Sequence, residues 1–239
     1  MSITNETYGI SCEIAIADAF GVPVSPEYRM RGENKIIQLV QPYVVNIFNC
    51  YGIPAPISHC AEKQNPVDFI LRDNSNLSIK SNMKDLGKVA PQNIGQPTAE
   101  TFFDYFTAEF FQDEGIEFPF QGVEFVDEKE KKQMFKNFAL NYPEILIREY
   151  WINLFHTDHY LHFYNLANGQ VKYIYLTKLA VPNFDKRLFT FTKEIGNWNE
   201  STTIKYNGIS IGEFQVHTNR NCLKFRFNMK KLLKAFENL

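Results

Sequence analysis

The sequence lacks paired cysteines, long apolar runs and a secretion signal. Its four cysteines, Cys12, Cys50, Cys60 and Cys222, are widely scattered and form no CxxC pair. This pattern argues against a structural zinc site and a disulfide framework, and it fits a reducing cytoplasm. No window of about 18 apolar residues suggests a membrane span, and the N-terminal segment has no basic region followed by a long apolar run. We therefore expect a cytoplasmic protein without membrane contact.

The sequence also lacks any large excess of charge. With 25 basic and 27 acidic side chains, its formal net charge is −2. A protein that binds a polyanion usually carries a basic face, so composition alone gives no sign of nucleic-acid binding. A nuclease must nevertheless place carboxylates beside DNA, and a local basic cleft can balance them. The remaining composition, 44% hydrophobic and 22% charged residues, is that of an ordinary globular chain.

Several familiar catalytic motifs are missing. The sequence contains no G-x-S-x-G, H-E-x-x-H, G-x-G-x-x-G or Walker-type loop, so hydrolase triads, zincins, dinucleotide sites and NTP sites have no support. The segment HTDHYLH at 156–162 could hold zinc if it were helical. We expect it to enter a strand instead, where His159 and His162 would face opposite sides.

The pattern of apolar and turn-forming residues predicts an α+β fold. Helices are expected over 10–20 (ended by Gly21), 26–50, about 97–110, from 127 with a break or restart at Pro143, and over 230–239. Strands are expected over 67–72, 77–82, 159–166, 171–177, 187–193, 202–206, 209–218 and 222–228. We interpret residues 1–239 as one domain, with a helical catalytic part at 1–157 and a β-rich recognition part at 158–239.

A carboxylate and a lysine fall on the first expected hairpin. Asp68 opens one strand and Lys80 lies in the next, with the polar turn DNSN between them. Phosphodiester hydrolysis needs this pairing, because a carboxylate holds a hard divalent cation and a lysine can orient water and stabilise the transition state. Two surface charges on an ordinary hairpin remain the alternative.

The segment 65–82 resembles the PD-(D/E)xK nuclease motif, with Asp68 as its aspartate and Lys80 as its lysine. It departs from the motif twice: the "PD" is spread over Pro66-Val67-Asp68, and Ser78 stands where Asp or Glu is usual. The resemblance implies the fold of that superfamily, a small mixed sheet flanked by helices, and a Mg²⁺-dependent nuclease. It also implies catalytic residues Glu13, Asp68, Ser78 and Lys80, and metal contacts from Glu13, Asp68 and Ile79.

The resemblance implies that an acid from elsewhere replaces the carboxylate missing at Ser78. Glu13 lies between Ile10 and Ile14 in an otherwise apolar helix, and Glu100 lies in the helix after the motif. We favour Glu13, because a carboxylate in that setting needs a reason. The alternative for Glu13 is an exposed glutamate stabilised by the helix dipole.

Two further stretches carry groups that can read DNA. The loop at 87–96 gathers Gln92, Asn93 and Gln96 beside glycines, and amides can pair with adenine. We expect the following residues to bind DNA: Lys84, Lys88, Gln92, Asn93, Gln96, Gln215, His217, Asn219 and Arg220. The alternative for the loop is a plain polar connection.

The second stretch runs from Ile211 to Asn221. Strand alternation places Gln215, His217 and Asn219 on one face. The pattern G-E-F-Q-x-H-x-N-R, followed by F-R-F, resembles the C-terminal signature of a group of restriction endonucleases. A solvated edge strand is the alternative.

Together these residues predict a type II restriction endonuclease that cleaves double-stranded DNA with Mg²⁺, and a palindromic target would suit a homodimer. The alternatives are a structure-specific or repair nuclease of the same superfamily and a non-enzymatic β-rich binding module.

Overall fold

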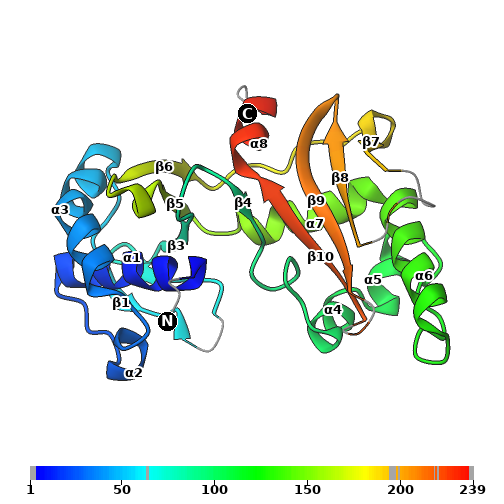
Figure 1. Cartoon of the computed structure of the whole chain (residues 1–239), viewed down its shortest axis with the longest axis horizontal. Coiled ribbons are helices and arrows are strands. Elements are labelled where there is room, and N and C mark those ends of the chain that lie inside the picture. Colours follow the sequence, from blue (N-terminus) through cyan, green and yellow to red (C-terminus); the bar gives the residue numbers. More distant parts are fainter. Residues whose placement is uncertain are drawn as a thin grey trace. The chain divides into compact units, whose positions relative to one another are not determined.

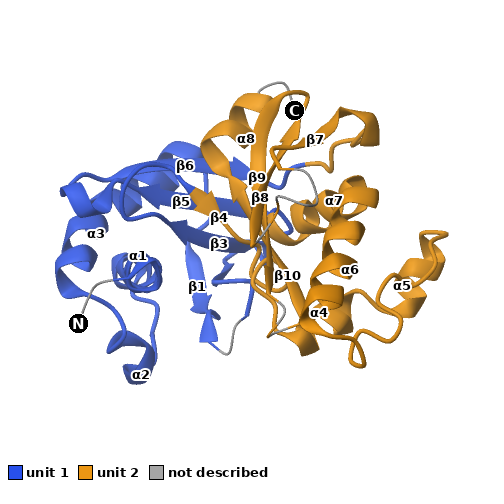
Figure 2. Ribbon diagram, turned by 45° about the vertical axis from the view of Figure 1, so that its right-hand side comes forward, with its two compact units in different colours: residues 1–87, 155–179 blue, residues 88–154, 180–239 orange. Residues whose placement is uncertain are grey.

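The computed structural model describes residues 4–62, 65–193, 198, 200–217, 219 and 221–236. The chain divides into two compact units, coloured separately in Figure 2. The first unit contains Met1–Gly87 and Phe155–Leu179, and the second contains Lys88–Leu154 and Ala180–Leu239. The expected division at 157/158 differs from this one, because the strands at 159–177 pair within the first unit.

The first unit is a five-stranded mixed sheet with helices (Figure 1). Its helices are α1 (Asn5–Phe20), α2 (Pro26–Arg29) and α3 (Asn34–Tyr51), and its strands are β1 (Pro56–His59), β2 (Phe69–Leu71), β3 (Asn76–Ser81), β5 (His159–Tyr164) and β6 (Lys172–Thr177). The strand order is β1-β2-β3-β5-β6. The β3–β5 pair is parallel and the other pairs are antiparallel.

Helix α1 of this unit begins and ends at capping residues. The Thr4 hydroxyl accepts the Thr7 N–H at the start of α1, and Gly21 ends the helix in the left-handed conformation at φ 69°. One helix was expected over 26–50, and this expectation was wrong, because residues 30–33 separate α2 from α3. The chain turns there against α1: a Cβ on Gly32 would lie 2.5 Å from Cδ1 of Ile14.

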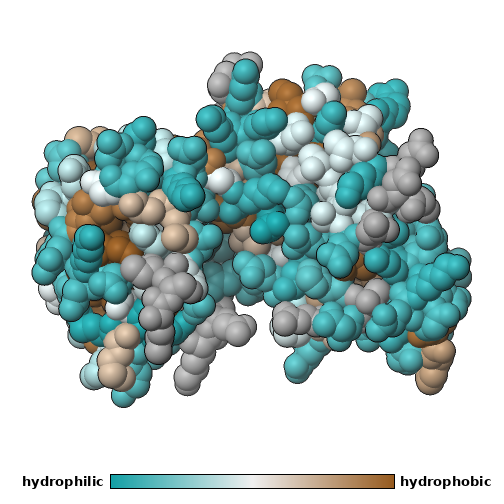
Figure 3. All heavy atoms as spheres, in the orientation of Figure 1, coloured by the Kyte–Doolittle hydropathy of each residue, from teal (hydrophilic) through white to brown (hydrophobic). Residues whose placement is uncertain are grey.

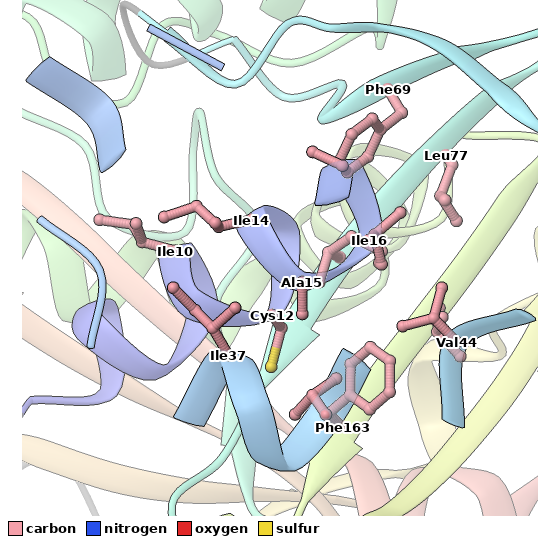
Figure 4. Close-up of a cluster of buried hydrophobic side chains, with 14 of the residues drawn as sticks. Ile10, Cys12, Ile14, Ala15, Ile16, Ile37, Val44, Phe69, Leu77 and Phe163 are labelled. Carbon is pink, nitrogen blue, oxygen red and sulfur yellow. The ribbon is translucent and has the colours of Figure 1, made fainter. Parts of the chain in front are cut away.

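The core of the first unit lies between α1, α3 and the sheet (Figure 4). Ile14 and Val44 from the helices and Leu77 and Phe163 from the strands are fully buried. The α1 residues Ala15, Ile16 and Ala17 are buried as well. The middle of helix α1 is therefore surrounded by protein, and a polar side chain there must find a partner inside the unit.

The second unit is an antiparallel sheet in the order β4-β10-β9-β8-β7. Its strands are β4 (Lys88–Val89), β7 (Phe189–Phe191), β8 (Ser201–Tyr206), β9 (Ile209–His217) and β10 (Cys222–Asn228). Its helices are α4 (Ala99–Tyr105), α5 (Ala108–Asp113), α6 (Glu128–Asn141), α7 (Pro143–Leu154) and α8 (Met229–Ala235). Short 3₁₀ turns occur at Leu166–Asn168 in the first unit and at Lys186–Leu188 in the second.

The abundance of phenylalanine is explained by packing in the second unit. Phe214, Phe225 and Phe227 on one face of the sheet are fully buried, and the Tyr150 ring of α7 stacks on Phe225 with centroids 4.9 Å apart. A second aromatic cluster joins Phe102, Phe106, Phe111, Phe120, Phe135 and Phe138. These rings interlock at the edge-to-face and tilted angles common in protein cores.

Most expected elements are confirmed. The 67–72/77–82 hairpin is β2–β3 with Phe69 opposite Leu77, and left-handed residues occupy the expected turns at Gly169 and Asn207-Gly208. The short strands β1 and β4 were missed. The α+β class is confirmed, while no comparison tests the PD-(D/E)xK core. None of the described helices is long and apolar enough to cross a membrane.

Candidate active site and candidate DNA interface

Asp68 and Lys80 lie together in the first unit. Lys80 Nζ is 3.9 Å from Oδ2 of Asp68, and the two side chains are 16% and 5% exposed. Asp68 immediately precedes β2, and its main-chain N–H donates to the Leu77 carbonyl, which continues the ladder with β3. The hairpin therefore brings the carboxylate and the ammonium group to one place, as the sequence predicts.

The next strand fixes the Asp68 carboxylate. The main-chain N–H of Ile79 donates to Oδ2 at 2.5 Å, and the Ser78 hydroxyl donates to the same oxygen at 3.2 Å. Hydrogen bonds to an ionised carboxylate are among the stronger ones in proteins. Within the described part of the chain, the hydrogen bonds to this carboxylate all go to Oδ2.

The protonation of Asp68 reflects its burial. The pKa of Asp68 is raised to about 7, chiefly by burial and also by the Glu13 carboxylate, against the opposing effects of Lys80, Ile79 and Ser78. Two carboxylates in a buried site repel one another, so a bound cation would relieve both the repulsion and the cost of burial. A strongly perturbed acid of this kind is typical of functional sites.

Glu13 is the second buried acid of the site. It lies mid-helix in α1 and is 6% exposed, so the alternative of an exposed glutamate was wrong. The Tyr28 hydroxyl donates to its Oε2 at 2.6 Å, and His59 Nε2 lies 3.1 Å from the same oxygen. The His59 ring also packs on Phe69, with centroids 5.2 Å apart. The described contacts thus hold Oε2.

The donor chemistry of this site fits a hard divalent cation. Asp68 and Glu13 offer carboxylate oxygens, and Ile79 can offer only its main-chain carbonyl, which projects from the same edge of β3 as its N–H. Strand β2 pairs with β3 only as far as Leu77, so that edge is not covered by the ladder. Within the described ranges, no cluster of three or more His, Cys, Asp or Glu side chains is placed to hold a metal. This donor set suits Mg²⁺, which binds few protein oxygens and keeps several waters.

The other candidates lie in different settings. Ser78 is 1% exposed and acts as a hydrogen-bond donor to Asp68. Glu100 is exposed in the first turn of α4, in the second unit. The candidate site of the first unit is therefore Glu13, Asp68, Ser78, Ile79 and Lys80.

A buried histidine lies beside Lys80. His162 on β5 is opposite Lys80 in the parallel register and is fully buried. Its Nε2 lies 2.9 Å from Asn82 Oδ1, which also accepts the Gly87 N–H, so Nε2 carries the proton. The Tyr160 hydroxyl lies 3.3 Å from Nδ1 and donates to it. This chain of hydrogen bonds fixes the turn that follows β3.

The pKa of His162 is lowered to about 3, chiefly by burial and also by the positive charge of Lys80. The ring is therefore neutral at physiological pH. From the sequence, this histidine was a zinc candidate only if its segment were helical, and the segment is strand β5; a zinc site is not seen among the described residues. Tyr28 and His59 were also missed, since their partner Glu13 lies 15 and 46 positions away.

The amide loop belongs to the second unit. Gln92, Asn93 and Gln96 are exposed, whereas Ile94 is 1% exposed. The loop is tied to β10, because the Phe225 N–H donates to the Gly95 carbonyl at 3.0 Å. A Cβ on Gly95 would lie 2.3 Å from Pro91, so this tight return requires glycine. The loop thus presents its amides outward from an anchored backbone.

Strand β9 shows the expected alternation. Phe214 and Val216 are buried, and Gln215 and His217 are partly exposed. Because β9 pairs with both β8 and β10, the alternative of an edge strand was wrong. Gln215, His217 and Asn219 also border a hollow of about 370 Å³ with Lys132.

The remaining recognition candidates are divided between the units. Lys84 is exposed in the first unit, and Lys88 on β4 of the second unit forms an ion pair with Glu213. Arg220 lies outside the described residues. Apart from Lys84 and Arg220, the recognition candidates gather in the second unit, and all five active-site candidates lie in the first.

Comparison with known proteins adds one relative. The chain is 31% identical over 171 residues to the type II restriction enzyme CviAII of Paramecium bursaria Chlorella virus 1. The match covers 71% of this chain and 44% of the relative, so the chain spans less than half the length of the enzyme that it matches. No protein-family model matches the sequence, and no solved structure matches the fold significantly. The resemblance of this sequence to type II restriction endonucleases is thereby confirmed.

Proposed function

We propose that the protein is a type II restriction endonuclease that hydrolyses phosphodiester bonds in double-stranded DNA with Mg²⁺. The observation that carries this proposal is the contact of Asp68 with Lys80 and Ile79, beside a second buried acid, Glu13. The similarity to a restriction enzyme supports the choice of substrate. The superfamily assignment, PD-(D/E)xK, rests on the motif formed by Asp68 and Lys80.

The residues of the site would divide the chemistry between them. Asp68, Glu13 and the Ile79 carbonyl would hold the cation, which when bound offsets charge on the phosphate and lowers the pKa of water. The Lys80 ammonium group, 3.9 Å from Asp68 Oδ2, would orient the attacking water and stabilise negative charge in the transition state. Ser78 and the Ile79 N–H keep the Asp68 carboxylate in one orientation.

We assign DNA recognition to the second unit. Gln92, Asn93 and Gln96 on the anchored loop and Gln215 and His217 on β9 offer groups that pair with base edges. Amide-rich surfaces favour base readout, whereas recognition of DNA shape relies more on lysine and arginine. A homodimer would match a palindromic target, and sedimentation with and without DNA would test this.

A plasmid-cleavage assay tests the proposed activity. The protein is incubated with a sequenced plasmid in Mg²⁺ or in EDTA, and the fragment ends are mapped. Discrete fragments with a common end sequence, formed only with Mg²⁺, are expected. Smeared products would indicate a non-specific or structure-directed nuclease, and intact DNA would contradict the proposal. Asp68→Asn, purified in parallel, controls for contaminating nucleases.

A further inference from the structure

We propose that the open face of the second sheet is a duplex-DNA contact surface in which Glu213 positions Arg226 and Gln215 for base contacts. This inference rests on the proposed function and deepens it. It adds Glu213, Lys224 and Arg226 to the recognition residues, none of which the sequence motif singled out for this role.

Strand register identifies the residues of this face. Residues directly opposite one another in antiparallel strands point to the same side of the sheet. Gln215 is opposite Ser201 on β8 and Lys224 on β10, and Glu213 is opposite Thr203 and Arg226. The polar face is defined by these two cross-strand rows, Ser201-Gln215-Lys224 and Thr203-Glu213-Arg226.

Among the described residues, the two sides of the second sheet differ in burial. All six residues of the polar face are partly exposed, whereas Phe214, Phe225 and Phe227 on the other side are fully buried. Figure 3 shows mostly hydrophilic and weakly polar residues over β8 to β10 in the orientation of Figure 1. The exposed side of an antiparallel sheet is available to a partner.

The charge of the polar face favours a polyanion. Lys224 and Arg226 lie on it, and Lys88 reaches it from β4, so three cations accompany one carboxylate. The whole chain has a net charge of −2, so the sign of this face is opposite to that of the protein as a whole. Duplex DNA is the polyanion that also offers hydrogen-bonding base edges to Arg and Gln.

The Glu213 carboxylate bonds both to cations of this face and to the side-chain amide of Gln215. Its Oε1 accepts from Arg226 Nη2 and from Gln215 Nε2, each at 2.9 Å, and its Oε2 pairs with Lys88. Burial raises the pKa of Glu213, but the hydrogen bonds from Lys88 and Arg226 outweigh this effect and lower it. The carboxylate is therefore ionised at neutral pH.

An ionised carboxylate on a DNA-binding face lowers the affinity for DNA but can improve the selection of bases. It repels phosphates, so it weakens binding to any sequence. It also restrains one end of the Arg226 guanidinium and the Gln215 amide, which leaves the Gln215 carbonyl oxygen and the second terminal nitrogen of Arg226 oriented. Arg pairs with guanine and Gln with adenine in fixed geometries, so this restraint favours selection of bases over general attraction.

The test compares four variants that differ in what they remove. Glu213→Gln removes the negative charge and keeps the shape, Arg226→Lys keeps the charge and loses the planar fork, and Lys224→Ala removes a cation from the face. Lys129→Ala, on α6 of the same unit, removes an exposed cation elsewhere and is the matched control. Circular dichroism and thermal melting establish that each variant is folded.

The probe is a short duplex selected by the wild-type protein from a randomised library in Ca²⁺, compared with the same duplex scrambled. Selection by binding makes the probe independent of cleavage. We expect Glu213→Gln to bind the scrambled duplex at least about threefold more tightly. Its preference, the ratio of its affinities for the selected and the scrambled duplex, should fall about tenfold. Arg226→Lys should lose preference alone. Lys224→Ala should bind both duplexes more weakly and reduce the slope of log affinity against log salt by about 1.

Specific results would overturn the inference. Variants of the polar face that bind like Lys129→Ala, or a wild-type protein that binds polyglutamate as tightly as the selected duplex, would exclude a DNA-reading face. Weaker binding of both duplexes by a folded Glu213→Gln would overturn the positioning role. Cleavage is measured separately. If the wild type cleaves DNA but the polar-face variants bind both duplexes like the wild type, the proposed function stands and the inference about the polar face is contradicted. A protein that depends on them for binding but never cleaves supports the face and contradicts the nuclease.

Discussion

Ile79 donates its main-chain N–H to Oδ2 of Asp68 at 2.5 Å, so the carboxylate that precedes one strand is held by the backbone of the next. Lys80 follows Ile79 directly, and its ammonium group lies 3.9 Å from the same oxygen. The register of the hairpin therefore brings the acid and the lysine together. A substitution of Asp68 or Lys80 should therefore abolish DNA cleavage while the fold persists.

Asp68→Asn and Lys80→Ala should each reduce the cleavage rate by a factor of one hundred or more. Each change removes a group assigned to the cation or to the water, at a cost of roughly 3 kcal/mol in the transition state. Single-turnover cleavage of plasmid DNA measures the loss, and circular dichroism verifies the fold. Asp73→Asn in the exposed turn of the same hairpin is the control. Near-wild-type cleavage by either active-site variant would exclude the proposed centre.

The role of Ser78 is separable from that of Asp68. Ser78→Ala should lower the cleavage rate only severalfold, because a hydroxyl is a poor ligand for a hard dication and the Ile79 N–H still holds Asp68. The same single-turnover assay applies. A loss as large as that of Asp68→Asn would place the Ser78 oxygen on the cation.

Glu13 and Glu100 are distinguished by metal affinity. Glu13→Gln should weaken Mg²⁺ binding and cleavage together, since Glu13 is buried and acts on the Asp68 carboxylate electrostatically. Glu100→Gln should leave both nearly unchanged, because Glu100 is exposed in α4. Isothermal titration with Mg²⁺ and cleavage over a range of Mg²⁺ concentrations measure the two effects. The reverse result would assign the migrated acid to Glu100.

Local patterns were sufficient to predict much of the fold and the centre of the site. The β2–β3 hairpin follows from two short apolar runs around a polar turn, and α1 ends at Gly21 because glycine accepts the left-handed conformation without strain. Asp68 and Lys80 could be paired because a hairpin brings residues close in sequence to the same edge. Each of these inferences needs only neighbouring residues.

The parts that were missed depend on contacts between distant residues. His162 meets Asn82 across 80 positions, and Lys88 reaches Glu213 across 125. The short strand β4 exists because two residues complete the edge of β10, which no local pattern reveals. The division between the units was also hidden, since β5 pairs in parallel with β3 after a long excursion of the chain. Long-range pairing of this kind is decided by tertiary packing rather than by propensity.

His162 should make stability depend on pH in a defined direction. Its pKa is about 3 in the folded protein and about 6.5 unfolded, because burial and Lys80 disfavour the charged ring. Between these values the unfolded chain binds the extra proton, so stability present above pH 6.5 is lost as the pH falls, by about 1.4 kcal/mol per unit. His162→Gln should lack this contribution, a difference of about 2 kcal/mol in pH dependence between pH 6.5 and 5.

Urea unfolding of the wild type and of His162→Gln in EDTA at pH 7.5, 6.5, 5.5 and 5 measures this difference. Because only the change of the unfolding free energy with pH is compared, any effect of the substitution that is the same at every pH drops out. His159→Gln is the control, since burial lowers the pKa of that half-buried ring and a smaller change is expected. Parallel profiles for wild type and His162→Gln would show that the ring does not titrate as its burial implies.

The amide loop at 87–96 and strand β9 with the residues that follow it should contribute to sequence specificity. Lys84 should contribute only to the affinity for DNA of any sequence. Replacing His217 or Asn219 by Ala should weaken binding of the cognate duplex by about 1–3 kcal/mol per lost base contact and barely change binding of a scrambled duplex. Replacing Gln92 or Asn93 should act in the same way, because the anchored loop presents both side chains to solvent. Lys84→Ala should weaken both duplexes equally and flatten the salt dependence, as a phosphate contact does. Titrations at two salt concentrations in Ca²⁺ separate these outcomes. If the His217 and Asn219 variants lose both duplexes equally, strand β9 contacts the phosphate backbone and base recognition passes to the loop.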